Sequence, residues 1–98
     1  MNLNQVTVPS RDVPKAISFY QKLGLKLIVH THDAYARFEC PMGEATFSIH
    51  EVAILEEDPG VVVYFEVDDV AEKVTELKKK GITFEQQTTQ QSWLWTEA

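Results

Sequence analysis

The chain has 98 residues, of which 44% are hydrophobic, and a formal net charge of −6 at pH 7. This length predicts one small globular domain and excludes a second, and an acidic chain with no cluster of basic residues beside aromatic ones is not expected to bind nucleic acid. Cys40 is the single cysteine, and neither a signal-peptide pattern nor a membrane-length apolar run occurs, so a cytoplasmic location without membrane or disulfide is expected.

Alternating polar and apolar residues surround one helical pattern in the first part of the chain. Asp12 is placed to cap the start of this helix and Gly24 to end it, while Pro14 is tolerated in the first turn. The apolar face of the helix consists of Val13, Ile17, Tyr20 and Leu23. The four predicted strands cover residues 3–8, 25–30, 34–40 and 44–52.

A polar connection over residues 55–60 leads into a second set of elements. Its helix begins at Asp69, with Glu72 three residues later as in a capping box, and ends at Gly81 after three lysines that favour the negative end of the helix dipole. The predicted strands of this second set cover residues 61–67, 82–87 and 92–98.

The two helical segments are copies of one pattern in a fixed register. Asp12 and Asp69 stand 57 positions apart, and so do Gly24 and Gly81 (69 − 12 and 81 − 24). A repeat of this size predicts two similar units, each burying one sheet face under its own helix, with function expected where the units meet.

Three stretches, "NQVTVPSRDVPKAISFYQKLGLKL", "ARFECPMGEATFSIHE" and "VVVYFEVDDVAEKVTELKKKGI", resemble the vicinal oxygen chelate superfamily, which includes glyoxalase I, bleomycin resistance proteins and extradiol dioxygenases. The resemblance implies an α+β fold of two βαβββ modules that form a half-open mixed β-sheet barrel with the helices outside. Module one is assigned to residues 1–54, the linker to 55–60 and an incomplete module two to 61–98, all within a single domain.

The resemblance also implies a divalent metal ion, such as Zn, Ni, Fe or Mn, bound by inner strands of both modules. The first ligand position, seven residues before Asp12, is Gln5, whose amide oxygen can coordinate a cation weakly. The second ligand position falls nearest Ser48, a poor ligand. His50 lies on the same strand face and is the substitute candidate, although it can equally be a hydrogen-bonded strand histidine.

The second module contains fewer candidate ligands for a metal ion. Its equivalent ligand position is Val62, which cannot coordinate, and Glu66 on the same strand face is the nearest carboxylate. If a metal-bound enediolate forms, Glu66 is the candidate for proton transfer. A further set of side chains is expected to bind the substrate: Arg37, Ser48, Tyr64, Trp93 and Trp95.

Two of these assignments have ordinary alternatives. Arg37 can hold an anionic group or pair on the sheet surface, and Trp93 with Trp95 can form a stacking platform or pack in the core. The leading hypothesis is a protein that binds a small organic molecule in a concave cleft, with metal-dependent lyase, isomerase or dioxygenase activity left open. The alternatives are a metal-free drug-binding or aromatic-ligand-binding protein for resistance or sequestration, and an interaction module with a vestigial cleft.

The resemblance further implies a homodimer, because modules of this family pair within or between chains. The 57-residue shift places the counterpart of strand 44–52 at positions 101–109, beyond Ala98. One inner strand is therefore expected to be missing from the second module.

Overall fold

A computed structural model of the chain describes residues 1–55, 61–84, 89–90 and 96–97. The chain divides into two compact units, Met1–Gly60 and Val61–Ala98. The elements of the first unit are β1 (Gln5–Ser10), α1 (Val13–Lys22), β2 (Lys26–Thr31), β3 (Tyr35–Glu39) and β4 (Thr46–Glu51). Those of the second unit are α2 (Val70–Lys79), β5 (Thr89–Gln90) and β6 (Thr96–Glu97).

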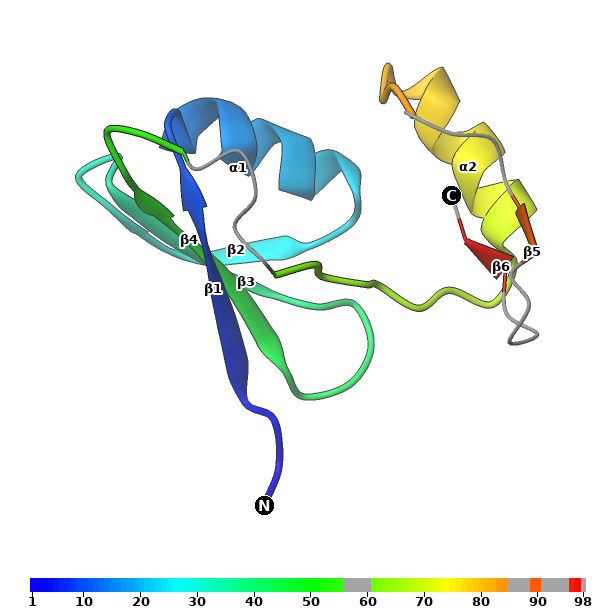
Figure 1. Cartoon of the computed structure of the whole chain (residues 1–98), viewed down its shortest axis with the longest axis horizontal. Helices are drawn as coiled ribbons and strands as arrows, with labels where there is room; N and C mark the ends of the chain where they lie inside the picture. The colour runs from blue at the N-terminus through cyan, green and yellow to red at the C-terminus, as the bar shows by residue number, and fades with distance from the viewer. Residues whose placement is uncertain (56–60, 85–88, 91–95, 98) are drawn as a thin grey trace. The chain divides into compact units, whose positions relative to one another are not determined.

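The first unit is a mixed four-stranded sheet in the order β1-β4-β3-β2, with α1 across one face (Figure 1). Strands β1 and β4 are parallel, whereas β3 is antiparallel to both of its neighbours. The parallel pair places Thr7 directly opposite Ser48, and the antiparallel pair places Arg37 opposite Ser48 from the other side. Residues far apart in the sequence therefore share one row across three strands.

The core of the first unit lies between α1 and the sheet. Tyr20 of α1 stacks at tilted angles on Phe47 and Phe38, with ring centroids 4.7 and 5.8 Å apart, and Phe38 is fully buried. Because successive strand residues point to opposite faces, Ser48 lies on the other side of the sheet from Phe47 and Ile49. The alternation of β4 thus separates an apolar face from a polar one.

Both helices begin and end as the repeat predicts. The Asp12 carboxylate accepts a hydrogen bond from the backbone N–H three residues on at 3.1 Å, and the Asp69 carboxylate does the same at 3.0 Å. Gly24 and Gly81 follow the helices with φ of 102° and 90°, the left-handed conformation that favours glycine. The corresponding helix ends are confirmed. None of the helices in the described ranges combines the length and apolarity needed to cross a bilayer.

The strands of the second unit depart from the prediction. Residues 61–67 lie in no strand, and neither do residues 82–84, while 85–88 fall outside the described residues. Of the strand predicted over 92–98, the described part is β6, which pairs with β5. The residue pattern of a segment indicates only that the segment suits a sheet. A strand also needs a neighbouring strand to hydrogen-bond with, and the pattern of one segment does not identify that neighbour.

Phe38 allows a direct test of the core. Replacing it with alanine removes a ring that is fully buried against Tyr20 and Phe47, and we expect the free energy of unfolding to fall by about 3–5 kcal/mol in urea denaturation. The control is Met42→Ala on the loop after β3, where the side chain is exposed and the expected change is within about 0.5 kcal/mol. Similar losses for the two variants would contradict this assignment of the core.

Candidate functional site: the polar face of the sheet

Six side chains from three neighbouring strands gather on the sheet face opposite α1, and we call this surface the polar face. Its members are Gln5 and Thr7 of β1, Tyr35 and Arg37 of β3, and Thr46 and Ser48 of β4. All but Thr7 are at least half-buried. The polar face thus combines one amide, four hydroxyls and one guanidinium group on regular secondary structure.

A hydrogen-bond network connects the three strands. The Gln5 Nε2 amide donates to the Ser48 hydroxyl at 2.8 Å and to the Tyr35 hydroxyl at 3.1 Å. The Thr7 and Ser48 hydroxyls are 2.6 Å apart, and Ser48 is completely buried although it points away from the apolar core. Because its members lie on paired strands and bond to one another, the network holds their polar groups in fixed positions.

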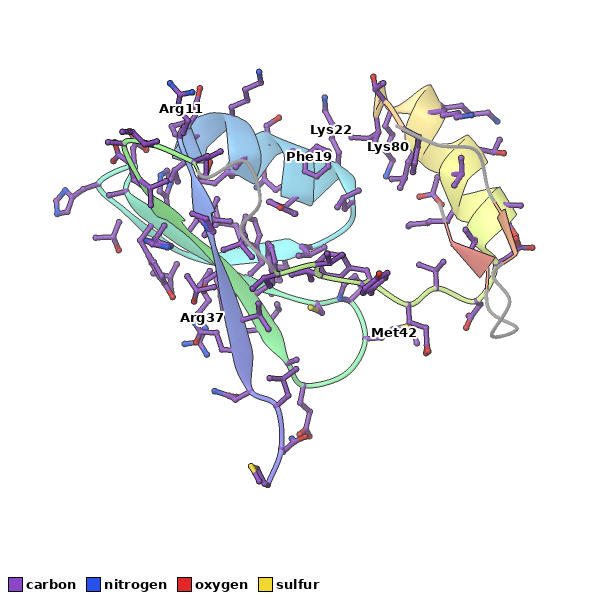
Figure 2. The ribbon with its side chains drawn as sticks, viewed as in Figure 1. Arg11, Phe19, Lys22, Arg37, Met42 and Lys80 are labelled. Carbon is purple, nitrogen blue, oxygen red and sulfur yellow. The ribbon has the colours of Figure 1, made fainter. Side chains whose placement is uncertain are left out.

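Arg37 stands at the edge of this network. Its Nε donates to the Thr46 hydroxyl at 3.1 Å, and that hydroxyl lies 3.3 Å from the backbone carbonyl of Asn4, to which it donates. Figure 2 shows Arg37 on the side of the sheet away from α1, whereas Phe19 belongs to the helix side. The guanidinium group is therefore oriented by the neighbouring strand.

The structure brings some of the predicted site residues together and leaves others apart. Gln5, Ser48 and Arg37 share the polar face. His50 shares this face of β4 with Ser48, as predicted, but it is exposed and pairs with Tyr35 in the strand register. Thr46 is the partner of Gln5, so His50 lies four residues further along β4, about 13 Å at the usual strand rise. Gln5 therefore contacts Ser48, and the structure shows no contact between it and His50.

The polar face does not fit a divalent metal ion. No group of three or more His, Cys, Asp or Glu side chains that could hold a metal occurs in the described part of the chain. The nitrogen of the Gln5 amide is directed at three hydroxyls, and neutral hydroxyl groups are weak ligands beside imidazole or carboxylate. No chemical step through a metal follows from this donor set.

The remaining predicted residues belong to the second unit. Val62, Tyr64 and Glu66 are exposed there. Substrate binding by Tyr64 and proton transfer by Glu66 stay predictions. The same holds for Trp93 and Trp95, which lie outside the described residues.

Three members of the polar face, Thr7, Tyr35 and Thr46, escaped the sequence prediction of the site. Each is an ordinary polar strand residue at an alternating position. What joins them to Gln5 and Ser48 is the parallel pairing of the first strand with the fourth, which the sequence analysis did not predict. Once the register of β1 and β4 is known, the alternation of side chains along each strand places these three residues on the same face as Gln5 and Ser48.

A shallow hollow of about 290 Å³ lies at the start of α1, away from the polar face. It is lined by Ser10, Asp12, Lys15, Ala16, Phe19 and Tyr20. Asp12 already caps the helix, and burial raises the pKa of the Tyr20 phenol above its ordinary value. The surface of the hollow is mostly apolar although several of its residues are polar, so the polar face exposes more groups that can orient a ligand and is the better candidate site.

A double-mutant cycle tests whether Gln5 and Ser48 interact. Gln5→Leu and Ser48→Ala each leave polar partners unsatisfied, so we expect the two losses in unfolding free energy to be non-additive by about 1 kcal/mol. Thr75 of α2 bonds to the Ala71 carbonyl and shares no partner with Gln5, which makes Gln5→Leu with Thr75→Ala the control cycle. Additive losses in both cycles would show that the bond contributes nothing to stability.

Comparison with known proteins places these features in a family. The sequence model of the Glyoxalase/Bleomycin resistance protein/Dioxygenase superfamily matches residues 2–95. No sequence among the curated proteins matches the chain.

Several solved structures share the fold. A bleomycin resistance determinant encoded on the transposon Tn5 superposes with a TM-score of 0.71 at 20% identity, covering 98% of this chain and 84% of the other. Lactoylglutathione lyase from Agrobacterium tumefaciens gives a TM-score of 0.70 at 19% identity, with 93% and 78% covered. A bleomycin-binding protein complexed with bleomycin gives 0.68 at 20% identity, with 98% and 84% covered.

Proposed function

Because the chain belongs to the Glyoxalase/Bleomycin resistance protein/Dioxygenase superfamily, we propose that it binds a small organic molecule on the polar face. The observation that carries the proposal is the network in which Gln5 joins Ser48 to Tyr35 across three strands. Ligand sites place a few polar groups precisely on a rigid scaffold, and strands provide such a scaffold.

The composition of the polar face supports binding over simple exposure to solvent. A solvated sheet face usually bears long charged side chains, whereas the four residues that form the hydrogen-bond network, Gln5, Thr7, Tyr35 and Ser48, are neutral and all but Thr7 are at least half-buried. In the described part of the chain, the carbonyl oxygen of the Gln5 amide has no partner and can accept a hydrogen bond. The Tyr35 hydroxyl can donate one. The polar face can therefore orient a ligand that has both donors and acceptors.

The related structures support a ligand of this general kind. One of them is a bleomycin-binding protein with bleomycin bound, and another is a lactoylglutathione lyase. Those names describe those proteins, and at about 20% identity only the class of ligand, a small organic molecule, enters the proposal. The donor set of the polar face favours binding without a metal over metal-dependent lyase, isomerase or dioxygenase chemistry.

The homodimer and the cytoplasmic location expected from the sequence remain part of this proposal. Cys40 is a free thiol in the structure, as suits a reducing compartment.

Metal analysis tests the metal-free part of the proposal. Protein purified without chelators is expected to contain well under one equivalent of Zn, Ni, Fe or Mn by mass spectrometry of the elements, because hydroxyls surround the Gln5 amide. The control for any metal found is a pair of variants, Gln5→Leu on the polar face and Gln21→Leu on the exposed side of α1. One equivalent that Gln5→Leu abolishes and Gln21→Leu retains would overturn metal-free binding.

Two tyrosines on opposite sides of the sheet provide a matched test of the site. Neutral aromatic and heteroaromatic compounds can be screened by thermal shift, since a ligand that binds only the folded chain raises its stability. For a compound that binds, we expect Tyr35→Phe to weaken the affinity about 2- to 10-fold, the cost of one neutral hydrogen bond. Tyr20→Phe removes a hydroxyl from the α1 side and should leave the affinity unchanged.

Nuclear magnetic resonance titration locates the same compound on the molecule. The perturbed amide signals should concentrate in β1, β3 and β4. Equal losses of affinity in the two tyrosine variants, or perturbations centred on α1, would place the ligand elsewhere.

A further inference from the structure

Arg37 is the one charged residue among the six of the polar face, and no carboxylate among the described residues forms an ion pair with it. The ion pairs among the described residues lie elsewhere, between His30 and Asp33 and between Glu76 and two lysines. Glu39, the next residue on the same side of β3, is exposed and forms no such pair with Arg37. A half-buried cation without an anion is costly, because it loses part of its hydration and gains no opposite charge in return.

The orientation of Arg37 leaves its outer edge available. Nε is occupied by Thr46, which is itself held by the Asn4 carbonyl. A guanidinium group has five N–H donors in one plane, so the four donors of the two Nη atoms remain after Nε has bonded. Both Nη atoms can then meet two oxygens of one carboxylate or phosphate in a bidentate arrangement.

The position of Arg37 connects this cation to the rest of the site. Arg37 lies opposite Ser48 in the register of β3 and β4, and Ser48 accepts the hydrogen bond from Gln5. A ligand whose anionic group meets Arg37 can therefore extend its uncharged part over the amide and hydroxyls. We propose that the ligand of the polar face contains a carboxylate or phosphate group and that Arg37 binds this group through both Nη atoms. This inference rests on the proposed function.

The carboxylate nearest to Arg37 along β3 is that of Glu39, two residues away on the same side of the strand. Glu39 is exposed, so water and salt screen its charge, and the five other residues of the polar face are neutral. A neutral ligand would cover Arg37 without supplying an anion. An oxyanion neutralises the guanidinium group directly, and this difference gives the site its selectivity.

Three small probes of similar size test the inference: benzoate, phenyl phosphate and the neutral benzamide. In titrations of the full chain followed by nuclear magnetic resonance, at least one of the two anions is expected to bind about tenfold or more tightly than benzamide. Shifts should appear in β3 and β4. The ratio of the two anion affinities distinguishes a carboxylate ligand from a phosphate ligand.

Variants of Arg37 assign the effect to this side chain. Arg37→Gln should weaken binding of the preferred anion about 10- to 100-fold, to the level of benzamide, without lowering the melting temperature. Arg37→Lys keeps the positive charge but loses the planar guanidinium group with its paired N–H donors. Its affinity for the anion should therefore lie between those of Arg37→Gln and the natural chain. Arg11→Gln, which removes an exposed arginine between β1 and α1, is the matched control and should bind the anions as the natural chain does.

The outcomes separate this inference from the proposed function. If neutral compounds bind at Tyr35 while neither anion exceeds benzamide, or if Arg37→Gln leaves anion binding unchanged, the role of Arg37 is wrong and small-molecule binding stands. If no compound of either kind binds, both are wrong. If Arg37→Gln loses its fold, Arg37→Lys decides: a folded lysine variant with full anion affinity contradicts bidentate binding.

Discussion

The parallel pairing of β1 with β4 is the constraint on which the candidate site depends. It is the contact that brings Gln5 and Thr7, from the start of the chain, against Ser48, more than forty residues later. Since side chains alternate along a strand, a slip of one residue would turn Ser48 towards α1 and Phe47 towards the polar face. The aromatic contacts under α1 oppose that slip, so the packing of the core fixes the geometry of the site.

The two faces of the sheet therefore differ in character. The apolar face supplies stability through buried rings, and its side chains point away from those of the polar face. A resistance determinant and a lyase each share the fold of this chain at about 20% identity to it. Function in such a family has to be argued from the polar side chains of each member.

How far the sequence predicts this structure depends on the range of the interactions involved. The ends of a helix depend on local interactions. The Asp12 carboxylate bonds within the first turn, and Gly24 ends the helix through its own left-handed backbone conformation, so both ends could be predicted from the sequence. Residues 61–67, VVVYFEV, have the β-branched and aromatic composition of a strand and form none in the described chain, because a strand depends on a distant partner. The sequence favoured His50 over Ser48 as a metal ligand because of its residue type. The strand register, which is a long-range property, instead brings Ser48 into contact with Gln5.

The contact between Gln5 and Ser48 also bears on what the polar face can select. The oxygen of the Gln5 amide has no partner among the described residues, but a cation placed there would find only neutral hydroxyl groups beside it, and these are weak ligands. An organic ligand can meet the amide oxygen, the Tyr35 hydroxyl and the Nη atoms of Arg37 where they stand. The preformed network thus favours an organic molecule over a metal ion.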